Sequence, residues 1–485
     1  MRILVLESST TSAKAMLYSS REGILRSCAQ AYSPEHNRNG MQDADYVLAE
    51  TLRMGREAAA GGPVDMITVG GVWHSVLCCA RKTMEAVTPV YSWSYTGAAE
   101  FTRKLRQDRA YTLDYYRRCG CMPHVTYSPF KLMYLRQAEG LDLSDKFCCE
   151  QSAYNYYHLT GQCASSASTA SGGGLINLRT MDYDGETRKE LGLSLDQLPE
   201  LRTYREPLPL SGKGAAALGL KSGIPVLPPM PDGGLNQAGA AALDPGGPMT
   251  LSVGTSAALR RTMDRPVLSG PPSTWCYLSP ENTYISGAAT AGACNCLDWA
   301  LERFFPAGTT HAQAQEAPVP PEELPTFLPF LFGERCPGWR DDRPASLPGL
   351  RGFHGSSHLY YGVMQGILFN LYQCYQTLCG LSGVPETIKL SGGILRAPVW
   401  VQMCCDVFGH DMECPDLEQA SMLGAAALAL EAGGALASSR DFPQPPQTVV
   451  HYQPEAHRRY EQAYQRYLSW YGRLQPGEER KEVAI

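Results

Sequence analysis

Short apolar segments and polar turns alternate along the first 20 residues of the chain. Residues 3–6 and 13–18 are apolar, and the hydroxyl-rich residues 8–12 separate them. Apolar runs of this length, bounded by turn residues, are typical of buried strands. The pattern therefore predicts two strands joined by a polar turn. A third strand is predicted over residues 66–72, which contain a diglycine.

Helical and strand patterns continue to alternate through the rest of the chain, which favours an α/β fold. We expect helices near residues 98–106, 131–137, 236–243, 398–408, 421–432 and 454–474, and strands over 249–253 and 388–390. Residues 225–234 are rich in Pro and Gly and precede the alanine-rich helix signal at 236–243. The turn cluster at 244–248 marks a boundary, so we expect an N-terminal domain over 1–244 and a C-terminal domain over 245–485.

Composition narrows the class of protein. A length of 485 residues is typical of two or three domains. The net charge of -6 argues against nucleic acid as a partner, because phosphate backbones attract basic surfaces. The first apolar run is too short for a signal peptide, and no run approaches the ~20 residues of a membrane span. We therefore expect a cytoplasmic protein with no membrane partner.

The chain has 17 cysteines, and an odd number in a long unsecreted chain is typical of reduced thiols. Several lie close together in sequence, but none forms a pair of CxxC knuckles, so the zinc signal is weak. Buried apolar thiols are the simpler interpretation, and a metal or iron–sulfur site is the alternative.

Three strand-to-turn segments have the residue types of a phosphate or nucleotide site. They cover Glu7–Lys14, Leu251–Ala257 and Leu390–Arg396. Turn N–H groups and hydroxyls bind phosphate oxygens, and a diglycine lets backbone approach a ligand closely. Each segment alone is also compatible with an ordinary turn, and none contains the Walker lysine loop.

Asp232 lies close to the predicted domain boundary, where a helix is expected to begin. Phosphoryl transfer requires positioning, charge neutralisation and a carboxylate that accepts the hydroxyl proton. Asp is also a common helix N-cap, and this pattern alone favours the cap.

Taken together, these segments resemble the FGGY carbohydrate kinases, and within them the gluconate kinase branch. The resemblance runs from about residue 2 to residue 435. The motifs that carry it are Asp232–Gly239 with Val253–Ala257, Arg118–His124 with Lys131, Gly333–Trp339, Ala345–Gln365, Ser391–Arg396 with Trp400, Gln402 and Asp406, and Ser421–Ala426. In order and at these spacings, they are specific for the family.

The resemblance implies two actin-like, hexokinase-like (ribonuclease H-like) lobes with the active site in the cleft between them. It implies ATP and Mg²⁺ as cofactors, a small-molecule carbohydrate as substrate and Asp232 as the general base. The expected nucleotide-binding residues are Thr10, Thr11, Ser12, Lys14, Gly254, Thr255, Ser256, Gly392, Gly393 and Arg396. The expected substrate-binding residues are Trp73, His74, Ser75, Trp93, Tyr95, His124 and Asp232, and the expected metal ligands are Glu7 and Asp232.

This chain departs from the family pattern at both ends of the expected site. Glu7 and Ser9 replace an Asp and a Gly of the first motif, which lengthens the carboxylate arm and adds a side chain beside the phosphates. In the sugar loop, Trp93–Gly97, Tyr95 and Gly97 replace an Asp and an Arg. In a separate segment, Trp73 replaces a Met. Because a bidentate Arg is lost, gluconate itself is a doubtful acceptor. The aromatic side chains at 73, 93 and 95 suit a bulkier or more neutral relative.

Three functions fit the sequence. The leading hypothesis is an active kinase for a sugar, sugar acid or polyol, with a homodimer as one candidate oligomeric state. The second is a catalytically weak pseudokinase that senses a sugar or a nucleotide. The third is an ATPase that drives a partner's redox chemistry, as dehydratase activators do, and the many cysteines motivate it.

Overall fold

The computed structural model describes residues 1–60, 62–415 and 419–473, which form two compact units. Unit 1 comprises residues 1–247, 261–286 and 417–444, apart from the undescribed residues. Unit 2 comprises residues 248–260, 287–416 and 445–485, with the same restriction. The domain division after residue 244 stays a prediction.

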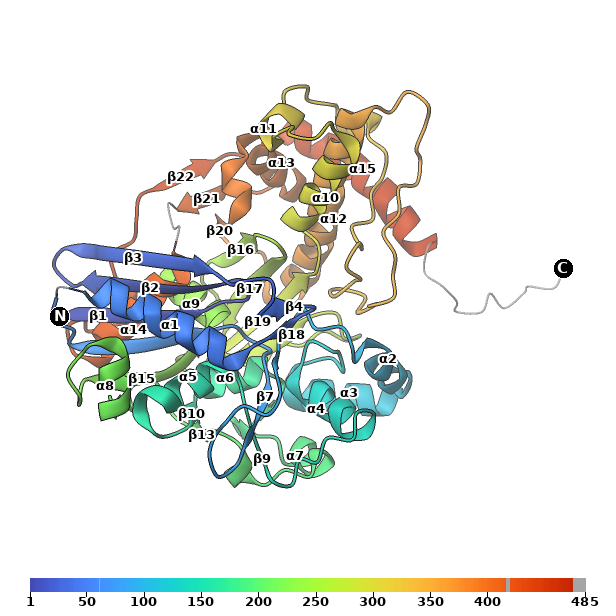
Figure 1. The fold of residues 1–485 in the computed structure, drawn as a ribbon. Helices are drawn as coiled ribbons and strands as arrows, with labels where there is room; N and C mark the ends of the chain where they lie inside the picture. The colour runs from blue at the N-terminus through green and yellow to red at the C-terminus, as the bar shows by residue number, and fades with distance from the viewer. Residues whose placement is uncertain (61, 416–418, 474–485) are drawn as a thin grey trace. The chain divides into compact units, whose positions relative to one another are not determined.

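The main sheet of unit 1 has six strands in the order β14-β15-β6-β1-β2-β3 (Figure 1). These are β1 (Arg2–Ser8), β2 (Ser12–Ser19), β3 (Gly23–Ala31), β6 (Met66–Gly71), β14 (Leu208–Pro209) and β15 (Pro225–Pro231). Strand β6 is parallel to both β1 and β15, and the register aligns Ser8, Gly71 and Pro231. Three carboxyl ends therefore meet at one edge of the sheet. The predicted pair β1–β2 and the predicted strand β6 are confirmed.

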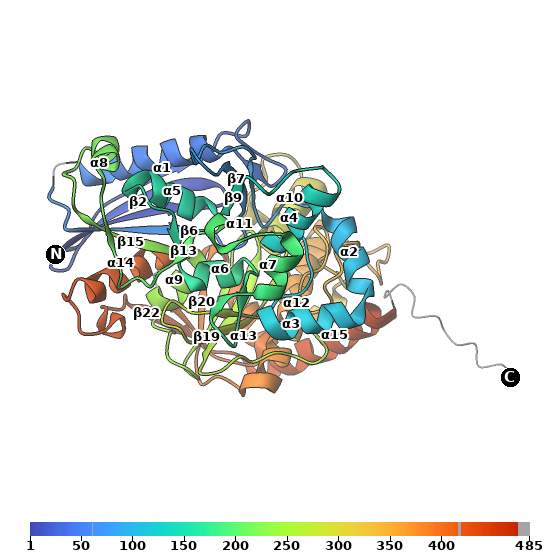
Figure 2. The ribbon, with the colours of Figure 1, turned by 90° about the horizontal axis from the view of Figure 1, so that it is seen from below.

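Alternating side chains of β1 pack in opposite directions. Ile3 and Val5 belong to a core shared with α14 (Ala420–Ala432), whereas Leu4 and Leu6 belong to a core shared with α1 (Ala44–Ala59). Successive side chains of a strand point to opposite faces, so a strand covered on both faces is apolar throughout. Figure 2 shows α1 and α14 on opposite sides of this sheet.

Unit 1 contains further helices and short strands, of which β18 (Trp275–Leu278) pairs with β19 (Tyr284–Thr290) in a second, seven-stranded sheet. The helices are α2 (Ala99–Gln107), α3 (Arg109–Cys119), α4 (Ser128–Gln137), α5 (Gln151–Thr160), α6 (Ala167–Gly172), α7 (Gly185–Leu191), α8 (Gly212–Leu218) and α9 (Asp232–Gly239). Short strands are β4 (Asn37–Arg38), β5 (Met41–Gln42), β7 (Leu77–Ala80), β8 (Val90–Tyr91), β9 (Lys146–Cys149), β10 (Ala164–Ser165), β11 (Ile176–Asn177), β12 (Asp182–Tyr183), β13 (Glu200–Leu201) and β18 (Trp275–Leu278). The helices expected near 98–106 and 131–137 are confirmed as α2 and α4.

Residues 225–243 form a strand and a helix, and the bounds predicted for the helix were wrong. The proline-rich segment is strand β15, which tolerates its central prolines because the pairing with β6 shifts between Leu227 and Met230. The following helix begins at Asp232 and ends at Gly239, before the predicted end, and Ala241 then adopts a left-handed φ of 48°. The alanine-rich composition suggested a longer helix than the tertiary packing allows.

Unit 2 contains β16 (Met249–Val253), β20 (Ile388–Ser391), β21 (Met412–Pro415) and β22 (Gln447–Val450), whereas β17 (Ala257–Met263) and β19 (Tyr284–Thr290) begin in one unit and end in the other. Strand β16 pairs antiparallel with β17 and parallel with β20. The helices are α10 (Cys294–Phe304), α11 (His311–Ala314), α12 (Ser356–Ser382), α13 (Pro398–Phe408) and α15 (Pro454–Arg473). The predicted strands at 249 and 388 and the helices at 398, 421 and 454 are confirmed, except that residue 474 lies outside the described residues.

A buried ion pair lies inside unit 2. Arg343 NH1 is 3.0 Å from Glu334 Oε2, and both side chains are at most 2% exposed. Tyr471 Oη and Gly338 N also donate to Glu334 Oε1. Burial raises the pKa of Glu334, and the hydrogen bond from Tyr471 and the charge of Arg343 oppose this. Both carboxylate oxygens of the Glu in the Gly333–Trp339 motif are therefore hydrogen-bonded inside unit 2.

All 17 cysteines are free thiols, and most are buried. Within the described ranges, no group of three or more His, Cys, Asp or Glu side chains is arranged to hold a metal ion. In the same part of the chain, no helix combines the length and apolar character needed to cross a bilayer.

Candidate active site

The carboxyl ends of β1, β6 and β15 bring three predicted segments of unit 1 together. The three-residue connection Ser9–Thr11, here called the first turn, follows β1, residues 72–75 follow β6, and Asp232 follows β15 directly. Ligands of open α/β sheets bind at the carboxyl ends of parallel strands. This edge is therefore the candidate active site of unit 1.

The carboxylate of Asp232 is held by backbone N–H groups. Gly233 N donates to Oδ1 at 2.7 Å, and Trp73 N donates to the same oxygen at 3.3 Å. The N-cap position of α9 is occupied by Pro231, which makes no side-chain capping bond. Asp232 is the first residue of the helix. The interpretation of Asp232 as an N-cap is therefore wrong, and its orientation depends on the segment after β6.

The first turn is closed by its own serine side chain. Ser9 N donates to Ser12 O at 2.9 Å, and Ser9 Oγ donates to the same carbonyl oxygen at 2.8 Å. The hydroxyls of Ser9 and Ser12 also form a hydrogen bond at 3.0 Å, in which either can be the donor. Ser12 N and Thr11 N donate to Ser9 Oγ at 3.1 and 3.4 Å. The added side chain at position 9 therefore bonds to the turn itself.

Thr10 anchors the first turn to neighbouring segments. Asn37 Nδ2 and Gln42 Nε2 each donate to Thr10 O at 2.9 Å, and Trp93 Nε1 donates to Thr10 Oγ1 at 2.9 Å. Thr11 is exposed at the tip of the turn. The predicted sugar loop and the predicted phosphate turn are thus joined by one side-chain hydrogen bond.

Glu7 lies at the end of β1 and is only 3% exposed. Lys14 Nζ is 3.1 Å from Oε1, and Ser421 Oγ of α14 donates to Oε2. Both carboxylate oxygens therefore bond within unit 1. Lys14, predicted to neutralise phosphate charge, is held beside Glu7 by this ion pair.

Trp73 is buried in an aromatic group, with 4% of its surface exposed. Its ring packs edge-on against Trp275 and Tyr277, and Nε1 donates to Ser168 O at 3.1 Å. A Cβ on Gly233 would lie 1.9 Å from this ring, so only glycine fits beside Asp232. The ring of Trp73 therefore packs against the N-terminal end of α9, and a substrate contact for it stays a prediction.

His74 and Ser75 follow Trp73 and are also buried. His74 has a left-handed φ of 67°, which is uncommon outside glycine and is often found at functional sites. Its Nδ1 bonds to Gly172 O, and Ser75 Oγ accepts from Gln151 N at 3.4 Å. A cavity of about 20 Å³ adjoins both residues.

Lys131 of α4 is a site residue that the sequence motif contained but did not assign. It is fully buried, and Nζ donates to His74 O at 2.6 Å, Ser92 O at 2.7 Å and Tyr91 O at 3.2 Å. The ammonium therefore joins the segment after β6 to the loop after β8. A lysine in a mainly apolar helix was the available signal, because a buried lysine needs hydrogen-bonding partners.

Tyr95 folds back over its own loop. Its ring packs edge-on against Tyr91 at 4.8 Å, and a Cβ at Gly97 would lie 2.2 Å from its hydroxyl. Burial raises the pKa of Tyr95, and the charge of Glu139 adds to this. The rings of Trp73 and Tyr95 have different partners, so contact of both rings with one substrate stays a prediction.

His124 is buried, and its Nδ1 accepts Thr126 N–H at 3.1 Å. The neutral ring then carries its proton on Nε2. Contact of His124 with a substrate stays a prediction.

In unit 2, the predicted nucleotide segments meet at the carboxyl ends of β16 and β20, where Ser252 pairs with Ser391. Residues Gly254–Ser256, here called the second turn, follow β16, and Gly254 N donates to Ser256 O at 2.9 Å. Gly392 has a φ of 96°, and a Cβ there would lie 2.5 Å from Val253 O. Only glycine allows the two strand ends to approach this closely.

The start of α10 lies beside these glycines. Cys294 N donates to Gly254 O at 2.9 Å, and Cys294 Sγ lies 3.3 Å from the Cβ position of Gly393. Burial raises the pKa of Cys294 to about 11, so the thiol stays protonated at neutral pH. Arg396 is exposed at the end of a 3₁₀ turn.

The other residues of the Ser391–Asp406 motif stabilise α13. Trp400 Nε1 donates to Met364 O at 3.3 Å, and Gln402 Nε2 donates to Asp406 Oδ1 at 3.0 Å. Burial raises the pKa of Asp406, whose Oδ1 also accepts Gln453 N at 2.7 Å.

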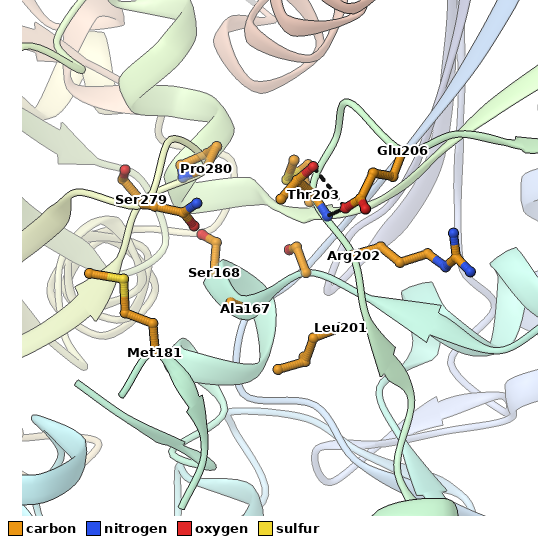
Figure 3. A pocket seen from close by; sticks show the side chains of 12 residues that line it. Ala167, Ser168, Met181, Leu201, Arg202, Thr203, Glu206, Ser279 and Pro280 are labelled. Atoms are coloured by element: carbon orange, nitrogen blue, oxygen red, sulfur yellow. Dashed lines mark hydrogen bonds between the residues drawn. The ribbon is translucent and has the colours of Figure 1, made fainter. Parts of the chain in front are cut away.

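A separate cavity of about 210 Å³ lies in unit 1 beside α6 (Figure 3). It is lined by Ser166, Ala167, Ser168, Met181, Leu201, Arg202, Thr203, Glu206, Met230, Ser279, Pro280 and Asn282. Ser168 Oγ donates to Leu278 O, and Thr203 N donates to Glu206 Oε2. No residue predicted for the site lines this cavity.

The fold is similar to that of solved two-domain kinases. It superposes on gluconate kinase from Lactobacillus acidophilus with a TM-score of 0.91 at 24% identity, covering 98% of each chain. A xylulose kinase from Rhodospirillum rubrum gives a TM-score of 0.86 at 19% identity, covering 98% of this chain and 99% of that one. These likenesses establish the two-domain, actin-like fold.

The chain belongs to the FGGY family of carbohydrate kinases. Residues 2–239 match the N-terminal domain of that family, and residues 249–432 match its C-terminal domain. The protein is therefore an ATP-dependent sugar kinase, a phosphotransferase.

Curated relatives cover most of the chain. Gluconokinase of Bacillus licheniformis is 25% identical, over 90% of this chain and 88% of the relative. Xylulose kinase of Escherichia coli (strain K12) is 28% identical, over 54% of each chain.

Proposed function

We propose that this kinase phosphorylates a hydroxyl of a sugar, sugar acid or polyol that is gluconate-like or a bulkier or more neutral relative. Asp232 acts as the general base. The observation that carries this proposal is the position of Asp232 at the carboxyl ends of three strands, with Oδ1 oriented by Gly233 N–H and Trp73 N–H.

In the proposed mechanism, the acceptor hydroxyl hydrogen-bonds to the Asp232 carboxylate, which takes its proton as the hydroxyl oxygen attacks the γ-phosphorus of ATP. The bond between that phosphorus and the bridging β-phosphate oxygen breaks, and ADP leaves with the bonding electron pair. A positioned base contributes about 10²–10⁴-fold to such a step. The two backbone donors fix the carboxylate, so no reorganisation is needed when the proton moves.

Each unit contributes one phosphate-binding turn in this proposal. In unit 1, the hydroxyls of Thr10, Thr11 and Ser12, the N–H groups of the first turn and of Ser12, and the ammonium of Lys14 interact with phosphate oxygens. In unit 2, the N–H groups and hydroxyls of the second turn do so, and Gly392, Gly393 and Arg396 border the adenosine. Exposed hydroxyls at the turn tips and the close backbone approach at Gly392 support these roles.

The carboxylates at the edge of unit 1 fit a magnesium ion, because Mg²⁺ prefers oxygen ligands and keeps several waters. Glu7, through water, and Asp232 would hold it. Bound Mg²⁺ neutralises charge on the phosphates. Glu7→Gln is expected to raise the Mg²⁺ concentration needed for half-maximal rate about tenfold, and an unchanged Mg²⁺ titration would refute the assignment.

The substrate class rests on the loop after β8. Tyr95 and Gly97 stand where the resemblance places an Asp and an Arg, so the loop has no charged pair for a carboxylate. The proposed acceptor contacts are His74, Ser75, Trp93, Tyr95 and His124. The sequence similarity to gluconokinases supports an acceptor with a polyol chain. The uncharged loop supports an acceptor that is less acidic than gluconate.

The test is ADP release from ATP and Mg²⁺ across a panel of sugars, polyols and sugar acids, with Asp232→Asn beside the unaltered protein. Release with one acceptor, lost in the variant, supports the proposal. Silence across the panel together with retained nucleotide binding would favour a second candidate, a sensor with little turnover. The Ser9 hydroxyl within the first turn is the observation that favours this candidate.

A further inference from the structure

The first turn contains a side chain that bonds to the turn's own N–H groups. Thr11 N and Ser12 N both donate to Ser9 Oγ, at 3.4 and 3.1 Å. Neighbouring N–H groups that converge on one point form the concave arrangement by which turns bind anions. In the first turn, the Ser9 hydroxyl occupies the position in which an anion's oxygen would accept hydrogen bonds from these two N–H groups.

The second turn differs at the corresponding position. Both turns connect antiparallel strands through three residues, and Gly254 occupies the place of Ser9. A Cβ on Gly254 would meet only Ser256 O, at 3.9 Å, so local packing does not require glycine there. Among the described residues, no side chain accepts a hydrogen bond from Thr255 N or Ser256 N. The second turn thus leaves its N–H groups to an external acceptor.

We infer that Ser9 sets the nucleotide affinity of this kinase by competing with a phosphate oxygen for the N–H groups of Thr11 and Ser12. The inference rests on the proposed role of the first turn in phosphate binding. A nucleotide must displace the hydroxyl before these two donors can reach it, and the exchange of one acceptor for another reduces the gain on binding.

The chain offers a matched control at the other end of β2. Ser19 Oγ accepts Arg21 N and Glu22 N, each at 3.3 Å, so it repeats the contacts of Ser9 with residues two and three positions later. Ser19 is the last residue of β2, at the end of the strand opposite the first turn. Removal of its hydroxyl tests the same local bond without a nearby phosphate role.

The experiment compares Ser9→Ala, Ser9→Gly and Ser19→Ala with the unaltered protein. Calorimetric titration with ADP and with a non-hydrolysable ATP analogue gives each dissociation constant. Both Ser9 variants should bind about three- to tenfold more tightly, which is the range expected for one hydrogen bond, and Ser19→Ala should not change. Hydrogen exchange should show faster exchange at Thr11 N and Ser12 N in Ser9→Ala.

Several outcomes would overturn the inference. Unchanged or weaker binding in Ser9→Ala would mean that the hydroxyl is neutral or itself assists the nucleotide. Tighter binding in Ser9→Gly alone would assign the effect to side-chain bulk or backbone freedom. If the unaltered protein binds and turns over nucleotide while the Ser9 variants match it, only this inference fails. If no protein of the set binds nucleotide, the proposed function fails with it.

Discussion

The sheet edges of the two units share a plan and differ in chemistry. Each has parallel strand ends and a three-residue turn into an antiparallel strand. The edge in unit 1 has two carboxylates, Glu7 and Asp232, whereas position 252, which corresponds to Glu7 in β16, is a serine. The edge in unit 2 is built from glycines that bring backbone close together.

This difference suggests a division of roles. Phosphoryl transfer needs a proton acceptor and a site that binds phosphates through many weak donors. Side-chain carboxylates suit the first task and exposed backbone suits the second. The proposal therefore assigns proton acceptance to unit 1 and most nucleotide binding to unit 2.

The sharpest test of this division is Asp232→Asn, with the largest expected effect. The amide keeps the shape of the side chain but cannot accept the proton, so kcat should fall by about 10²–10⁴-fold. Because the nucleotide is assigned mainly to unit 2, the dissociation constant of ADP should stay within about twofold. Steady-state kinetics and calorimetry measure the two quantities, and normal turnover would refute the assignment.

Each unit also has a buried cationic side chain, Arg343 in unit 2 and Lys131 in unit 1, and their partners differ. Arg343→Met should lower the free energy of unfolding by about 3–5 kcal/mol, because Glu334 is left buried without its ion-pair partner. The control is Arg340→Met, which removes a part-exposed pair with Asp342 and should cost no more than about 1 kcal/mol. Denaturant unfolding measures the free energy of unfolding of each variant. Equal decreases in the two variants would contradict the prediction.

In unit 1, the buried cation has carbonyl partners instead of a carboxylate. Lys131→Met should cost about 3 kcal/mol, because the carbonyls of His74, Tyr91 and Ser92 lose their shared donor. Where the variant folds, the KM of the acceptor should rise while the dissociation constant of ADP holds. Lys104→Met, which removes an exposed pair with Glu100, is the control. A variant with unaltered acceptor KM would show that Lys131 does not position the substrate loop.

The smallest effect is expected at the second turn. Gly254→Ala adds a methyl group that meets only ordinary packing, so the melting temperature should not change. Nucleotide affinity should fall about threefold, because the methyl group stands beside the N–H groups proposed to bind phosphate. Unchanged affinity would argue against a phosphate role for this turn.

Strongly patterned elements could be predicted from sequence. The β1–β2 pair, β16 and α13 follow from apolar runs bounded by turn residues, and they appear at the predicted positions. Residues 225–231 could not be placed, because prolines argue against a strand unless a register shift accommodates them. The length of α9 was missed because the backbone at Ala241 opposes its helix-forming composition.

By itself, the sequence determined the family, the α/β character and the identity of the carboxylates and turns, because these depend on residue types in order along the chain. Only the tertiary structure decided that Lys131 joins two loops, that Asp232 lies inside α9 after the N-cap position Pro231, and that Ser9 bonds to its own turn. Each of these depends on where a side chain points after strands distant in sequence have paired, and linear spacing carries no such information.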